Sequence, residues 1–157
     1  MQIIKDYLQK LALISDEDWV VFSTKFEKQI FKKKDLIIKS GDVENYLSFI
    51  ETGIVRFWIE TEDKDVIFDF TYEKSFFSAY LSFLTRESTN WNIQEVTPIV
   101  LWRISYTDLQ LIYDQTQVGE KIGRLAAENL FMMATKRKIS LLTSTAEELY
   151  VELFIKM

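Results

Sequence analysis

The feature that most constrains the fold is a series of short β-rich runs between Gln29 and Ser105, each ended by a turn. DLIIK closes with a Ser-Gly-Asp turn, and YLSFIETGIVRFWIET holds two strand-like runs separated at Thr52-Gly53. VIFDFTY follows a polar turn, and NIQEVTPIVLWRIS completes the series. Short strands at close, regular spacing are typical of an antiparallel sandwich or barrel. We predict a β-jelly-roll.

Helical periodicity flanks this series on both sides, so the predicted fold class is α+β. Apolar residues recur at helical spacing from Ile3 to Leu11, and Ser15 precedes three acidic residues as an N-cap would. A stretch from about Thr116 to Leu142 predicts one helix of ~38 Å. The sequence predicts a separate helix after it, with Ser144 or Thr145 as the N-cap.

These patterns divide the chain into three parts. Residues 1–115 form the N-terminal helices and the roll, residues 116–143 the long helix, and residues 144–157 a final short helix. Because the long helix should extend beyond the roll, we expect its apolar stripe to form a homodimer seam, although packing on its own roll is the alternative. The seam candidates are Val118, Ile122, Leu125, Ala126 and Met133.

Two missing residue types restrict the chemistry. The sequence contains neither cysteine nor histidine, which removes thiol nucleophiles, disulfides, the commonest general base and the commonest metal ligand. No spacing of acidic residues points to a carboxylate site. We therefore expect no enzyme activity, no metal and no cofactor.

Charge and hydropathy limit the partners. The net charge of −5 is opposite to that of a free-standing nucleic-acid-binding domain. No run reaches the ~18 apolar residues of a membrane span, and the N-terminus lacks a signal-peptide layout. We expect a cytoplasmic protein with no membrane partner.

The order of helix, roll, helix and long helix resembles that of the Crp/Fnr family of bacterial regulators, over roughly residues 10–157. IIKSGD resembles the family's strand and turn, and YLSFIETGIVRFW resembles its hairpin with Gly53 at the turn. IVLWRISYTDLQLI resembles the last strand of the cyclic-nucleotide-binding fold and the helix after it. The resemblance implies a dimeric sensor with a small-molecule effector, which the sequence does not identify.

The family's phosphate-binding cassette resembles SFFSAYLSFLTRESTNWNIQE in spacing but not in chemistry. Ser78 stands at the family's glycine, Ala79 at its ribose-binding glutamate, and Thr89, Asn90 and Trp91 at its Arg-Ser-Ala. Alanine cannot accept a ribose hydrogen bond and threonine cannot neutralise a phosphate. The resemblance therefore predicts a degenerate pocket that does not bind cyclic AMP in the usual way.

Other residues near the cassette leave alternatives open. Arg86 could enter the pocket by another route or lie at a helix end. Tyr80 and Trp91 could stack on a flat ligand or fill the space of a lost one. The family's iron–sulfur and haem sensors, and the histidine-based metal site of the cupins, are excluded because the required ligands are missing.

In this family a winged helix-turn-helix follows the long helix. TAEELYVELFIKM resembles its first helix, and the given sequence stops at Met157. With three glutamates and one lysine, this segment should not bind DNA by itself. We expect the sensor and dimerisation part of a longer regulator, whose DNA contacts depend on a domain absent from this chain. The alternative is a stand-alone β-roll that binds a small molecule or a protein.

Overall fold

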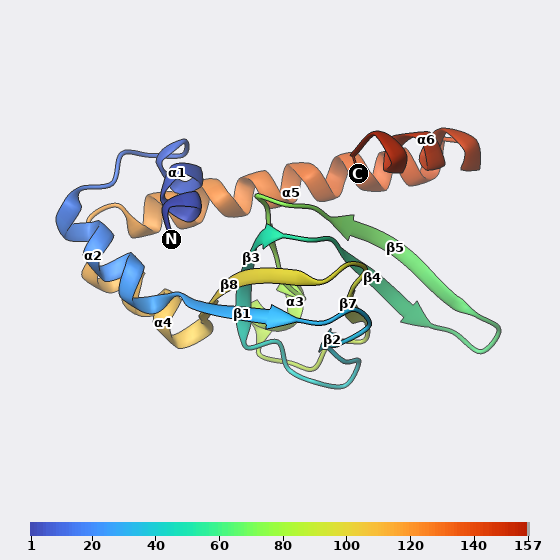
Figure 1. Cartoon of the computed structure of the whole chain (residues 1–157), viewed down its shortest axis with the longest axis horizontal. Coiled ribbons are helices and arrows are strands. Elements are labelled where there is room, and N and C mark those ends of the chain that lie inside the picture. Colours follow the sequence, from blue (N-terminus) through green and yellow to red (C-terminus); the bar gives the residue numbers. More distant parts are fainter. Residues whose placement is uncertain (157) are drawn as a thin grey trace.

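The computed structural model describes residues 1–156, which fold as a β-roll with helices at one end and a long helix along one side (Figure 1). The strands are β1 (Glu27–Phe31), β2 (Leu36–Ile38), β3 (Tyr46–Thr52), β4 (Val55–Glu60), β5 (Asp65–Thr71), β6 (Phe76–Phe77), β7 (Asn92–Glu95) and β8 (Ile99–Ser105). The helices are α1 (Gln2–Gln9), α2 (Asp16–Lys25), α3 (Tyr80–Thr85), α4 (Tyr106–Gln115), α5 (Gly119–Thr143) and α6 (Ala146–Lys156).

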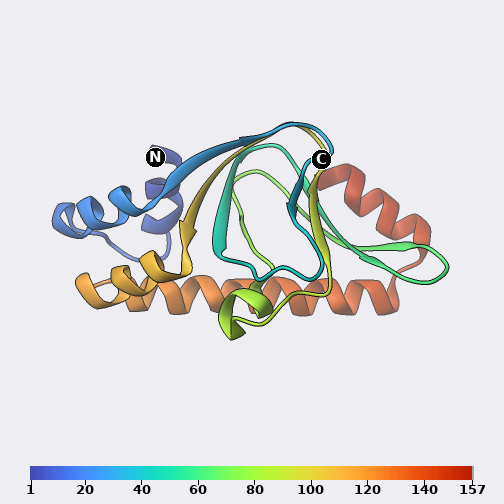
Figure 2. The same cartoon turned by 90° about the horizontal axis from the view of Figure 1, so that it is seen from below.

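The strands form two four-stranded antiparallel sheets. The first has the order β1-β8-β3-β6 and the second the order β2-β7-β4-β5. The turn from β3 to β4 therefore passes the chain from one sheet to the other. Seen from below, α5 runs beneath the whole roll and α6 turns back at its far end (Figure 2).

Gly53 makes that passage possible. Its φ of 109° is a left-handed value that side chains disfavour. A Cβ here would also lie 2.8 Å from the carbonyl oxygen of Pro98. The turn expected at Thr52-Gly53 thus has two independent reasons to require glycine.

Side chains along the strands of the first sheet alternate between its two faces, and they contribute to two separate cores. Phe49 and Ile104 point outward and pack with the helices, in a cluster that includes Leu8 and Ile122. Ile50 and Leu101 point inward and form the core of the roll with the second sheet. The first sheet is thus buried on both faces.

Helix α5 begins at Gly119 rather than at about Thr116, where the sequence placed its start. Thr116 ends α4, and its Oγ1 accepts a hydrogen bond from the Gly119 N–H at 2.9 Å. The Asp18 carboxylate accepts from the N–H groups of Gln117 and Val118 at 3.1 and 3.2 Å. These side chains satisfy the N–H groups of the two residues before the helix and of its first residue.

The predicted fold class is confirmed: N-terminal helices, a β-roll and a long C-terminal helix follow one another in the expected order. Two predicted caps are also present, since Ser15 Oγ accepts from the Asp18 N–H and Thr145 Oγ1 from the Glu148 N–H. Thr145, not Ser144, therefore caps α6. Within residues 1–156, no helix combines the length and the apolarity that a membrane span requires.

Candidate functional site

The stretch that resembles the phosphate-binding cassette folds as β6, α3 and β7. Ser78 Oγ donates to the carbonyl oxygen of Tyr46 at 2.8 Å. Ala79 is fully buried among the roll core residues, and its N–H donates to Glu44 Oε2 at 3.2 Å. Both residues are held by β3 and the loop before it.

Thr89 and Asn90 lie after α3, on the way to β7. The N–H and carbonyl of buried Thr89 pair with Asp42 and Gly41, each at 2.8 Å. Its Oγ1 accepts from the Trp91 N–H at 3.4 Å. Asn90 is exposed. The backbone pairing ties this end of the cassette to the Ser-Gly-Asp turn.

Arg86 lies at the end of α3, with a left-handed φ of 63°. Its guanidinium donates to the carbonyl oxygens of Glu44 and Phe83 at 2.9 and 3.0 Å, and to Asn45 Oδ1 at 2.6 Å. It also lies over the Tyr106 ring, 4.5 Å from the centroid. The side chain is thus bound within the fold.

Aromatic rings fill the roll beside Ala79. Phe68 of β5 makes edge-to-face contacts with Phe57 and Trp91, with ring centroids 6.0 Å apart in both pairs. Phe57 also meets Phe77 at 6.3 Å. Trp91 thus packs against another aromatic residue of the chain. Tyr80 instead lines a different cavity, outside the roll.

Glu44 is a buried acid of this region that sequence reasoning missed. Its carboxylate accepts from the N–H groups of Tyr46 and Ala79 at 3.0 and 3.2 Å. Burial raises its pKa above the usual value, against the opposing effects of these hydrogen bonds and of Arg103 and Arg86. No sequence signal marks it, because GDVEN has the composition of a solvated turn.

The residues proposed for the dimer seam occupy two different environments. Val118 and Ile122 belong to the chain's own core, and half-buried Ala126 lines the cavity outside the roll. Leu125 is half-buried, whereas Met133 is 55% exposed. The C-terminal half of α5 and α6 also exposes large apolar residues, namely Phe131, Met132, Ile139, Leu142, Tyr150, Val151, Phe154 and Ile155.

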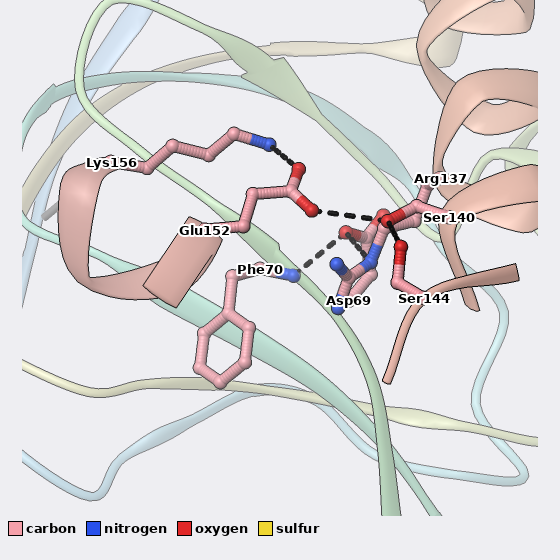
Figure 3. Close-up of polar contacts among 7 residues, drawn as sticks. All are labelled: Asp69, Phe70, Arg137, Ser140, Ser144, Glu152 and Lys156. Atoms are coloured by element: carbon pink, nitrogen blue, oxygen red, sulfur yellow. Dashed lines mark hydrogen bonds and ion pairs between the residues drawn. The ribbon is translucent and has the colours of Figure 1, made fainter. Parts of the chain in front are cut away.

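A polar junction joins α6 to α5 and β5 (Figure 3). Arg137 Nε lies 3.7 Å from Asp69 Oδ1, and Ser140 Oγ donates to Glu152 Oε2 at 3.0 Å. Lys156 donates to the other oxygen of Glu152. Burial raises the pKa of Asp69, whereas the hydrogen bonds from Lys156 and Ser140 lower that of Glu152.

The family follows from the sequence of the roll. A sequence model of the cyclic nucleotide-binding domain matches residues 28–116, which is more than half of the chain. The chain belongs to the cyclic nucleotide-binding domain family. No curated protein matches it in sequence.

Solved structures share the fold expected from the sequence. A cyclic nucleotide-binding domain from Methylobacillus flagellatus is 16% identical, with a TM-score of 0.78 over 92% of this chain and 83% of that one. The sensor domain of the transcriptional regulator DNR from Pseudomonas aeruginosa is 16% identical, with a TM-score of 0.65 over 92% and 93%. The Thermus thermophilus catabolite activator protein is 14% identical, with a TM-score of 0.68 over 86% of this chain. The chain spans 61% of the length of that activator.

Proposed function

We propose that this chain is the sensor and dimerisation part of a cytoplasmic Crp/Fnr-type transcription regulator, without catalytic activity of its own. The fold is shared with the sensor domain of a transcriptional regulator and with a catabolite activator protein. The family match covers the roll.

We further propose that the roll does not bind cyclic AMP in the usual way. The observation that supports this proposal is the packing of the roll core: Ala79 is fully buried in a cluster with Phe57 and Phe77, and Trp91 packs on Phe68. The cassette supplies an alanine and a threonine where the family resemblance places a glutamate and an arginine. A cyclic phosphate here would be desolvated without a cation, which is strongly unfavourable.

A thermal-shift and calorimetric titration with cyclic AMP and cyclic GMP tests this proposal. A ligand that binds the folded state at a hundred times its Kd adds ~2.7 kcal/mol of stability. We expect no shift of the melting temperature and no heat of binding. A saturable response to either nucleotide would refute the proposal, and a Thr89→Ala variant would then report whether this residue is involved.

The proposed dimer forms through the exposed apolar face of α5. A helix of 25 residues that buries only its first turns against its own chain leaves a surface that a second copy can cover. The DNA reader of such a regulator lies outside residues 1–156 in this proposal, because the charged residues of α6 are three acids and one lysine. Specific, saturable retardation of DNA by this chain in a mobility-shift assay would overturn that assignment.

A further inference from the structure

A cavity of about 40 Å³ lies outside the roll, between the outer face of the first sheet and the helices. Its walls come from α1, α2, α3, α4 and α5 as well as from the sheet. Helix α5 lines it with four small residues, Gly119, Gly123, Ala126 and Ala127, and with two large ones, Ile122 and Leu130. A volume of this size holds about three water-sized groups.

The closeness of α5 to α4 at Gly123 gives one wall of this cavity its shape. A Cβ at Gly123 would lie 2.6 Å from the ring and the hydroxyl of Tyr113. The phenol of α4 is therefore placed directly against the backbone of α5. Any larger residue at Gly123 would have to displace the Tyr113 ring.

Two hydroxyls, those of Tyr80 and Tyr113, are the only side-chain polar groups among the lining residues. Neither has a hydrogen-bond partner that affects its ionisation. Burial and the neighbouring Tyr80 raise the pKa of Tyr113 to about 12, so its phenol is neutral at physiological pH. Both residues that line the cavity therefore carry a protonated phenol, which is a hydrogen-bond donor.

We propose that this cavity is a binding site for a small neutral molecule with an apolar body and one hydrogen-bond acceptor, such as a short-chain ketone or alcohol. The cavity suits on the order of three to five non-hydrogen atoms when its open side is included. The site lies outside the roll, and Phe76 and Tyr80 of its wall belong to the cassette stretch. The proposal does not depend on the proposed function of the chain.

The chemistry of the wall selects this class of ligand over the alternatives. A charged ligand would be desolvated without an ionised partner, since no charged side chain lines the cavity. A buried water makes about three hydrogen bonds, with a range of about two to four, and the two hydroxyls of the lining side chains reach only the lower end of that range. A molecule with one acceptor and an apolar remainder leaves no polar group unpaired.

Methyl NMR spectra of the whole chain test the site with two probes, xenon and 2-butanone. We expect both to shift the methyl signals of Ile112, Ile122 and Leu130, while Val55 and Ile93 in the roll core stay unchanged. No response of the first group to either probe would overturn the proposal. Probe binding that depends on protein concentration would also overturn it, since a second copy of the chain would then occupy the cavity.

Cavity-filling variants make the test specific. Ala126→Leu should abolish binding of both probes, whereas Ala134→Leu, on the exposed side of the same helix, should leave binding unchanged. If Ala126→Leu fails to fold by circular dichroism, Ala127→Val is the second filling variant. Retained binding in a folded filling variant would show that the probes bind elsewhere.

The hydroxyls are tested separately. Tyr80→Phe and Tyr113→Phe keep the shape of the wall and remove one donor each. Loss of a hydrogen bond should weaken 2-butanone binding by about three- to tenfold while xenon binding is unchanged. Unchanged 2-butanone affinity in the double variant, or an equal loss for both probes, would refute the assigned acceptor contact.

Discussion

The roll interior and the α5–α6 segment use the same kinds of side chain in opposite ways. Phe77, in the roll, is 2% exposed, whereas Phe131, on α5, is 74% exposed. Two polar residues of the cassette also bind within the fold: Thr89 pairs with a turn, and the Arg86 guanidinium binds two carbonyls. The first region covers its large apolar side chains within one chain, whereas the second presents apolar surface that the chain does not cover. Residue type alone does not say where a partner lies.

The largest expected effect is on stability. Phe77→Ala should lower the free energy of unfolding by ~3–5 kcal/mol, because it removes a buried ring and leaves a cavity. The matched change Phe131→Ala should alter it by about 0.5 kcal/mol or less when the chain is monomeric. Urea unfolding at low protein concentration measures both. Equal losses would show that the α5 face is already packed.

The next effect is on self-association. Phe131→Asp should raise the dissociation constant of the proposed dimer at least ~30-fold, which corresponds to a hot-spot loss of about 2 kcal/mol. Lys121→Asp, an exposed change near the start of α5, is the control and should have a much smaller effect. Sedimentation equilibrium measures both variants. A dimer that resists Phe131→Asp would place the interface on another surface.

A smaller effect is expected at the junction of α6. Ser140→Ala removes the hydrogen bond to Glu152 and should cost ~0.5–1.5 kcal/mol of local stability. Amide hydrogen exchange should accelerate in α6 and remain unchanged in β3 and β8. Acceleration throughout the roll would contradict the separation of the two regions.

The smallest effects concern pH, and they have opposite signs in the two regions. The pKa of Glu44 is raised above its ordinary 4.5, so the folded state binds more protons than the unfolded state between pH 4.5 and the folded pKa. The free energy of unfolding therefore falls as pH rises through this window. The pKa of Glu152 is lowered, so its contribution is present above 4.5 and is lost as pH falls through the folded pKa. Glu44→Gln and Glu152→Gln should each remove one of these dependences. Urea unfolding between about pH 3 and 8 measures how the free energy of unfolding depends on pH. This range spans ~1.5 pH units below and ~3.5 above the ordinary pKa of Glu. Slopes of equal sign would refute the assignment.

Local patterns predicted most of the architecture. The turn at Gly53, the N-cap at Ser15 and the final helix after Thr145 are each determined by neighbouring residues, and all three are present. The start of α5 was placed three residues early because Asp18, about 100 residues away along the chain, binds the N–H groups of Gln117 and Val118. Periodicity carries no information about such a distant partner.

The candidate site was only partly accessible from the sequence. The cassette positions of Ala79 and Thr89 were predicted from spacing, and both residues are buried. The loss of cyclic-phosphate chemistry stays a prediction. Glu44 could not be predicted as a site residue, since the sequence alone does not distinguish a buried glutamate from a solvated one. Tyr113 and Gly123 lie ten residues apart on two helices, and only their packing brings them together.

The sequence by itself determined the order of helices and strands, the β-roll and the types of chemistry that missing cysteine and histidine exclude. These properties depend on short-range periodicity, turn residues and composition, which a single chain displays directly. Tertiary structure alone decided which apolar faces are buried and which groups Arg86 and Glu44 contact. It also decided that a cavity lined by two tyrosines lies outside the roll. Those outcomes depend on contacts between distant segments, and their energies are set by burial rather than by residue type.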